Sequence, residues 1–126
     1  MKLIIVTAII GVVTAVRSSE EFNDGVEGSP IIVSSSFFKQ SFKPGDRLQV
    51  YCQARGHPIP TINWYKNSRE IESDATHSIR FEMFNNTMRS FLDIFPATIG
   101  SKGEYECVAS NSRGVAIKHY SPNVKF

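Results

Sequence analysis

The sequence predicts an all-β fold, a sandwich or a barrel, and three observations support that prediction. Apolar and polar residues alternate with period two in several short runs. Turn-forming residues separate those runs at regular intervals, which is typical of sandwiches and barrels. No window carries the apolar stripe of an amphipathic helix, and the only helical turn that we expect lies within residues 96–102.

The composition is that of one globular domain. The chain has 126 residues, of which 41% are hydrophobic, 11% aromatic and 21% charged. These values exclude a disordered chain, a collagen-like fibre and a coiled coil. A net charge of +2 is too small to indicate a nucleic-acid-binding protein. The two cysteines are too few for a dense disulfide scaffold or a zinc site of four thiolates.

Residues 1–18 are expected to be a secretory signal peptide. Lys2 gives the chain a basic start, and residues 3–16 are apolar and uncharged, a run shorter than the roughly 20 residues of a membrane-spanning helix. Cleavage after Ala15 and cleavage after Ser18 both fit, and an uncleaved N-terminal anchor is the alternative. No second apolar run of membrane length follows. We therefore expect a secreted, extracellular product that does not insert into a membrane once the signal is removed.

Residues 19–29 are expected to form an acidic, flexible lead-in ahead of a domain over residues 30–126. The lead-in contains no basic residue, and its acidic residues are Glu20, Glu21, Asp24 and Glu27. Such a run is typical of a solvated segment, and a partner-binding tail is the alternative.

The domain opens with a strand region in which only some of the aromatic side chains can be buried. These aromatic residues are Phe37, Phe38 and Phe42. A turn over residues 43–46 follows, because Pro44 presets one backbone dihedral and Gly45 supplies a positive one.

Five runs then alternate between an apolar, inward-facing phase and an outward phase, and each predicts a strand. The inward-facing residues, in chain order, are Leu48, Val50, Cys52, Ala54; Ile62, Trp64; Ile79, Phe81, Met83; Leu92, Ile94; and Tyr105, Cys107, Ala109. Asn85 and Asn86 are expected to form a hairpin turn between the third and fourth runs, because asparagine tolerates a positive φ. Residues 111–114 are expected to form another turn.

The last strand has no clear inward face. Continuing the alternation from Ala116 places Lys118 inside, whereas the other phase places Val115 and Ile117 inside. Pro122 follows, and proline suits an edge strand or a bulge. We expect a bulge or a bent edge in this region.

Cys52 and Cys107 fall on the inward phases of two separate expected strands. In a secreted chain, two cysteines most simply form one disulfide, and free thiols or an intermolecular bridge are the alternatives.

Three local motifs resemble those of I-set immunoglobulin domains. Trp64 follows the first cysteine on an inward phase, and Tyr105 stands two residues before the second. The segments over residues 56–67, 92–94 and 103–114 are similar to strands B–C, E and F–G of that family.

The resemblance covers nearly all of residues 30–126 and implies a two-sheet Greek-key sandwich with one inter-sheet disulfide. It implies a core around that bridge, formed by Trp64, Leu92 and Tyr105. Ser101 stands where the family usually has an aspartate, which removes a possible ion pair at the corner between strands E and F.

No catalytic, cofactor or metal site is expected, so the sequence favours a protein that is not an enzyme. His57, His77 and His119 lie far apart in the sequence without ligand-spaced partners. Glu104 and Glu106 share one strand face, which is typical of an exposed surface. No nucleophile elbow, phosphate loop or zinc-protease helix is present.

Asn85 begins an N-glycosylation acceptor, Asn-Asn-Thr, on an expected turn. An unmodified hairpin is the alternative. A glycan at this position would shield one end of the sandwich and leave contacts to other surfaces.

Two surfaces are candidates for binding. The B–C and F–G loops of an immunoglobulin sandwich share one end, where Arg55, His57 and Arg113 would form a small basic rim. The outward aromatic residues form either an interface or local packing. These residues are Tyr51, Phe91 and Phe95.

The chain also resembles small secreted single-immunoglobulin proteins of invertebrates, nematodes especially. That resemblance implies binding or adhesion to an extracellular, cell-surface or matrix protein, often neuronal or synaptic, with homophilic pairing as one mode. The alternative is a secreted inhibitor or humoral defence factor that acts through its loops.

Overall fold

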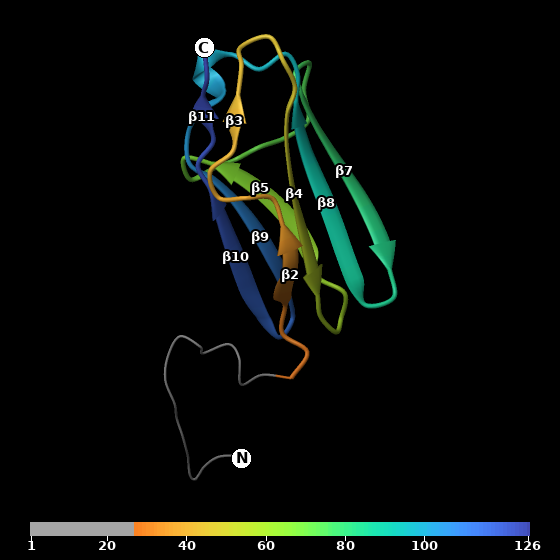
Figure 1. The fold of residues 1–126 in the computed structure, drawn as a ribbon. Helices are drawn as coiled ribbons and strands as arrows, with labels where there is room; N and C mark the ends of the chain where they lie inside the picture. Colours follow the sequence, from red (N-terminus) through yellow and green to blue (C-terminus); the bar gives the residue numbers. More distant parts are fainter. Residues whose placement is uncertain (1–26) are drawn as a thin grey trace.

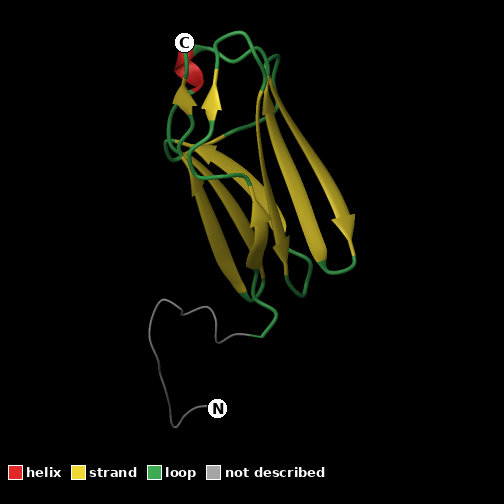
Figure 2. Cartoon of the chain, in the orientation of Figure 1, coloured by secondary structure: helices red, strands yellow, loops and turns green. Residues whose placement is uncertain are grey.

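The computed structural model describes residues 27–126. The expected signal peptide and residues 19–26 of the lead-in lie outside the described residues. Two four-stranded sheets pack face to face, and a short two-stranded ribbon lies beside them (Figure 1). This arrangement confirms the predicted all-β sandwich. The one described helix is a 3-10 turn over Ile99–Ser101, inside the segment where a helical turn was expected (Figure 2).

The first sheet has the strand order β2-β4-β8-β7, and all neighbours are antiparallel. Its strands are β2 (Ile31–Ser35), β4 (Leu48–Arg55), β7 (His77–Phe84) and β8 (Thr87–Ile94).

The second sheet has the order β10-β9-β5-β6 and is also antiparallel. Its strands are β5 (Thr61–Lys66), β6 (Arg69–Glu70), β9 (Tyr105–Asn111) and β10 (Gly114–Tyr120). In the two-stranded ribbon, β3 (Ser41–Phe42) runs parallel to β11 (Asn123–Val124).

The turn into β4 forms as its residue types predict. The amide of Asp46 donates to the carbonyl oxygen of Lys43 at 3.0 Å, and Gly45 has a φ of +94°, a conformation that favours glycine. Alternate residues of β4 are then buried, so one face of the strand enters the core. Of the crowded aromatic residues ahead of the turn, Phe42 is buried, whereas Phe37 and Phe38 are exposed.

The core forms around a disulfide that joins the two sheets. Cys52 on β4 and Cys107 on β9 are bonded, which confirms the expected bridge. Their separation of 55 residues corresponds to roughly 4 kcal/mol of stabilisation in the chain-entropy account of disulfides. Trp64, Leu92 and Tyr105 are all buried in the surrounding apolar cluster.

A polar connection crosses this core beside the disulfide. The indole Nε1–H of Trp64 donates to Oγ of Ser90 at 2.9 Å, and that hydroxyl donates to the carbonyl oxygen of Arg80 at 3.1 Å. Ser90 is fully buried. Because the Trp64 indole N–H and the Ser90 hydroxyl both have partners, the connection avoids the cost of an unsatisfied buried donor.

Tyr105 fixes the corner between β8 and β9. Its hydroxyl donates to the carbonyl oxygen of Ser101, and burial raises the pKa of Tyr105 to about 12. The Ser101 side chain accepts a hydrogen bond from the amide of Thr98 at 2.9 Å. Ser101 thus stabilises this corner by hydrogen bonds to Thr98 and Tyr105. The family usually has an aspartate at this position, which could form an ion pair instead.

The last strand stays regular where we expected an irregularity. β10 pairs with β9 without a register shift from Gly114 to Tyr120, and the chain leaves the sheet only afterwards, over residues 121–122, before it resumes as β11. The bulge of this fold lies in β2, between Ile32 and Ser34.

Candidate functional site

The outer face of the second sheet presents three rows of side chains across β10, β9 and β5. Directly paired residues of antiparallel strands point to the same face. The registers therefore define a first row of Val115, Ser110 and Thr61, a second row of Ile117, Val108 and Asn63, and a third row of His119, Glu106 and Tyr65. We call these nine residues the β10–β9–β5 face.

The centre of this face is apolar and exposed. Ile117 is 49% exposed and Val115 47% exposed, and Val108 lies opposite Ile117 on β9. Lys118, by contrast, points to the half-buried inner phase. The strand therefore places its β-branched apolar residues in solvent and its charged residue inward, which reverses the usual pattern of a half-buried strand.

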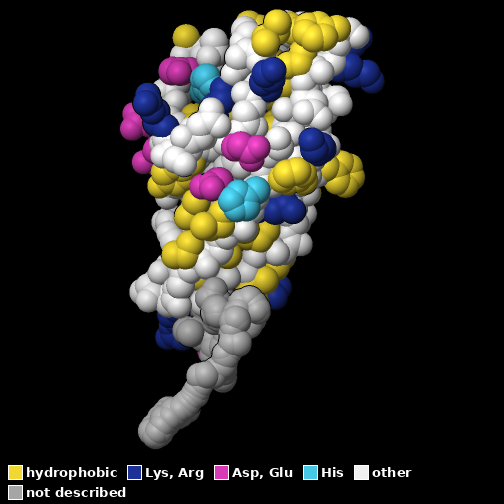
Figure 3. All heavy atoms as spheres, turned by 90° about the vertical axis from the view of Figure 1, so that its left-hand side faces the viewer, with side chains coloured by type: hydrophobic (Ala, Val, Ile, Leu, Met, Phe, Trp, Pro, Cys, Tyr) yellow, Lys and Arg dark blue, Asp and Glu magenta, His cyan; other side chains and the backbone are white. Residues whose placement is uncertain are grey.

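Polar and aromatic groups border the apolar centre. Nδ1 of His119 lies 3.5 Å from Oε2 of Glu106, and Nδ2 of Asn63 donates to Oε2 of Glu70 at 3.0 Å. In Figure 3, which shows the β10 side of the molecule, hydrophobic side chains form a broken band with acidic and histidine side chains between them. An apolar centre with a polar border is the usual anatomy of a protein-binding surface.

The expected basic rim holds the segment that precedes the domain. The Arg113 guanidinium donates to the carbonyl oxygen of Glu27 at 2.9 Å, and the amide of His57 donates to that of Gly28 at 2.9 Å. Gly28 has a φ of +88°, and a Cβ there would lie 2.5 Å from the His57 carbonyl oxygen, so only glycine fits. Residues 27–29 thus pack onto this end of the sandwich, contrary to the flexible lead-in that the sequence predicts for them.

The rim and the glycosylation acceptor share that end. Arg55 and His57 line the same shallow hollow as Asn86, and the amide of Gly56 donates to the carbonyl oxygen of Asn86 at 3.1 Å. Asn85 occupies the hairpin turn with a φ of +53°, which is the conformation expected for asparagine in such a turn.

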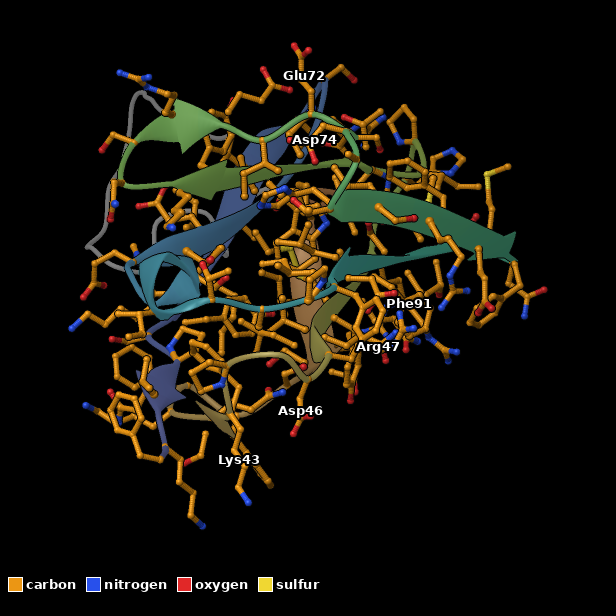
Figure 4. All side chains as sticks on the ribbon, turned by 90° about the horizontal axis from the view of Figure 1, so that it is seen from above. Lys43, Asp46, Arg47, Glu72, Asp74 and Phe91 are labelled. Atoms are coloured by element: carbon orange, nitrogen blue, oxygen red, sulfur yellow. A yellow bond between two sulfur atoms is a disulfide. The ribbon has the colours of Figure 1, made fainter. Side chains whose placement is uncertain are left out.

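Arginines of the same chain stack on two of the outward aromatic residues, Phe91 and Phe95, although Phe95 remains 49% exposed. The Arg80 guanidinium lies 4.5 Å from the Phe91 ring centre, and the Arg47 guanidinium lies 4.7 Å from that of Phe95. Tyr51 and Phe91 pack against each other with ring centres 6.0 Å apart. Figure 4 shows Arg47 and Phe91 on this outer side. These contacts favour local packing over an interface.

The segment between β6 and β7 carries a surface carboxylate, that of Asp74, which accepts several hydrogen bonds. Oδ1 of Asp74 accepts hydrogen bonds from the amides of Thr76 and His77 at 2.9 and 2.8 Å. The Thr76 amide, the His77 side chain and the His77 amide hold the pKa of Asp74 down at about 2. Figure 4 shows Asp74 and Glu72 at the edge of the molecule. Within residues 27–126, no three His, Cys, Asp or Glu side chains gather as metal ligands would.

The structure does not bring the three histidines together. His57 lies in the loop after β4, His77 begins β7, and His119 lies on β10. In the described part of the chain, no helix has the length and apolar character to cross a membrane.

Comparisons with known proteins place the chain in context. The sequence profile of the immunoglobulin I-set domain matches residues 31–124. The immunoglobulin domain-containing protein oig-1 of Caenorhabditis elegans is 41% identical over 106 residues, which cover 84% of this chain and 77% of that protein. The cell adhesion molecule DSCAM of Gallus gallus is 31% identical over 100 residues, which cover 79% of this chain but 5% of that much longer protein.

A solved structure supports the fold independently. Dpr2 Ig1-Ig2, in its complex with DIP-Theta Ig1-Ig3, matches with a TM-score of 0.75 at 20% identity. The match covers 79% of this chain and 33% of the matched chain.

Proposed function

This chain belongs to the immunoglobulin I-set family, and we propose that it is a secreted, non-enzymatic recognition module whose β10–β9–β5 face binds an extracellular or cell-surface protein. Its domain is homologous to a domain of cell adhesion molecules. A rigid sandwich that offers one face to a partner fits that relationship.

The observation that carries this proposal is the reversed pattern of β10. An exposed isoleucine costs the folded chain the stabilisation that burial of its side chain would give. A strand that keeps Val115 and Ile117 outward and Lys118 inward departs from local consistency, and such departures concentrate at functional sites.

The composition of the face indicates a protein as the partner. Its apolar centre suits a desolvated contact, while His119, Glu106 and Tyr65 at its border can form hydrogen bonds. The face is the outer side of a sheet, whereas small-molecule sites are usually concave pockets. The rim is a weaker candidate, because the Arg113 guanidinium already donates to the carbonyl oxygen of Glu27 and a glycan on Asn85 would lie at that end.

A binding screen with two matched variants tests the proposal. The tagged, secreted protein is presented to an array of extracellular domains, and the captured partner is titrated against Ile117→Lys and Ile99→Lys. The two isoleucines are 49% and 52% exposed, but Ile99 lies in the 3-10 turn, away from β10. A lysine in a desolvated interface centre should weaken binding at least about tenfold.

We expect Ile117→Lys to lose binding and Ile99→Lys to keep it. Equal binding by both variants would contradict the choice of face. Specific capture of a protease or a microbial polysaccharide would contradict the recognition role and favour an inhibitor or defence factor.

A further inference from the structure

We propose that the outer edge of β7 pairs with β7 of a second copy of this chain and forms a symmetric dimer by antiparallel strand addition. β7 is the last strand of its sheet and lies at the free margin of the sandwich (Figure 1). This contact is separate from the β10–β9–β5 face.

From residue 79 to residue 84, the edge of β7 lacks most of the usual protection against strand addition, although Arg80 and Glu82 are charged. Natural edge strands are blunted by proline, lysine, bulges or short length. β7 is eight residues long, its sequence HSIRFEMF contains neither proline nor lysine, and its register with β8 has no shift. The opposite edge strand of the same sheet, β2, is shorter and carries the bulge.

The backbone of β7 is in phase for such pairing. In an antiparallel ladder, residues alternate between directing both backbone groups to the partner strand and directing both away. The amide of Phe95 donates to the carbonyl oxygen of Thr76, so the even-numbered residues bond to β8. The odd-numbered residues Ile79, Phe81 and Met83 therefore direct N–H and C=O to the free edge, where they have no partner within residues 27–126.

The charged residues of β7 are complementary to those of β7 in a second copy of the chain. If the two-fold axis passes through Phe81, residues whose numbers are equally far from 81 face each other. Arg80 then lies opposite the second copy's Glu82, and the same pair forms again on the other side of the axis. Both side chains are exposed on the outer face. Glu82 accepts one hydrogen bond from Arg89 at 3.1 Å, but half of its side chain remains exposed, at 47%.

On the inner face of β7, the side chains that would meet in this register are apolar. Phe81 is 55% exposed and Met83 63% exposed, although both have the inward phase. The facing sheet ends in β6, which has only two residues, so it leaves this part of β7 uncovered. In the dimer, Phe81 would meet the second copy's Phe81, and Met83 would meet the second copy's Ile79. Asn85, the glycosylation acceptor, lies beyond the paired strand.

Charge reversal with rescue tests this dimer. Sedimentation of the secreted protein is measured at concentrations up to about 500 µM, a range that includes weak specific complexes. We expect the natural chain to dimerise. Arg80→Glu and Glu82→Arg should each weaken dimerisation at least about tenfold, because two attractive cross-strand pairs become two repulsive ones.

The rescue distinguishes strand pairing from a loss of folding. An equimolar mixture of Arg80→Glu and Glu82→Arg should dimerise again, because every facing pair is then Glu with Arg. The double variant Arg80→Glu/Glu82→Arg should also dimerise. A monomeric natural chain over the whole range, or single variants that dimerise like it, would overturn the proposal. Failure of the mixture and of the double variant to dimerise would overturn it as well.

Discussion

Ser90 is the only described partner of the one indole N–H in the core. It satisfies Trp64 and passes a hydrogen bond on to the backbone of Arg80. Replacing it by alanine leaves the Trp64 donor buried without an acceptor, since no other group within residues 27–126 accepts a hydrogen bond from Nε1.

Ser90→Ala should therefore lower the free energy of unfolding by about 1–3 kcal/mol. Chemical denaturation of the oxidised protein measures this change. Ser78→Ala serves as the control, because Ser78 is exposed on the neighbouring strand, and it should be close to neutral. A Ser90→Ala variant as stable as the natural chain would show that the hydrogen bond contributes nothing.

The buried tyrosines make stability depend on alkaline pH. Burial raises the pKa of Tyr105 to about 12 and that of Tyr120 higher still. The folded state therefore keeps these protons at pH values where the unfolded chain, with an ordinary tyrosine pKa of about 10, has released them.

The free energy of unfolding should accordingly be unaffected by these tyrosines below pH 10 and fall as the pH rises from 10 towards 12. The slope is at most about 1.4 kcal/mol per pH unit for each tyrosine. Denaturation between pH 8 and about 11.5 measures it, and Tyr105→Phe should show a smaller slope. A flat profile above pH 10 would contradict the assignment.

The sequence predicted the burial of some core residues but not of others. Cys52, Cys107 and Trp64 could be placed in the core because their types are distinctive and their strand phase was clear. Ser90 was missed because a serine carries no burial signal, although it shares the inward phase of Leu92. Tyr120 was missed because its strand phase was ambiguous. It is fully buried, 5.8 Å from the Trp64 ring and hydrogen-bonded to the Tyr51 carbonyl oxygen.

Among the elements, β10 shows why local pattern alone did not decide a strand's orientation. Hydrophobicity would place Val115 and Ile117 inside, whereas the structure buries Tyr120 and so sets the opposite phase for every residue before it. A long-range contact, the packing of Tyr120 on Trp64, outweighs the preference of two smaller side chains. The sequence leaves both phases open because Tyr120 and Trp64 lie far apart along the chain and their contact forms only in the folded domain.

The hairpin of β7 and β8 was predictable from its turn residues. We propose that Asn85 in this turn is N-glycosylated. Asn85 lies in an exposed turn, followed by Asn86 and Thr87, which is the geometry an acceptor needs. We expect Asn85→Gln, expressed through a secretory pathway, to run faster on a gel by one glycan. Glycosidase treatment of the natural protein should give the same shift. Identical mobility of the variant and the untreated natural protein would remove the proposed glycan.

At the scale of the whole molecule, the two proposed contacts use different sheets. A dimer through β7 extends the first sheet and leaves both copies of the β10–β9–β5 face open on the second. Such a dimer would bind clustered partners with an avidity above the affinity of one face. The end that carries Asn85 and the rim remains outside both contacts.

The whole fold was predictable because several independent signals agreed: strand alternation, turn residues, the cysteine pair and Trp64. The location of the proposed binding surface was not, because it depends on which residues of β10 and β7 lack cover in three dimensions. The expected rim illustrates the limit. Its basic residues do gather at one end, but the Arg113 guanidinium is already bonded to the backbone carbonyl of Glu27.

The most direct test of the recognition face is methyl cross-saturation by NMR, with the labelled protein bound to its captured, unlabelled partner. Saturation of the partner should attenuate the methyl groups of Val108, Val115 and Ile117, and leave those of Ile31 and Ile99 at full intensity. Attenuation confined to Ile31, Ile99 or other methyl groups outside the β10–β9–β5 face would contradict the account.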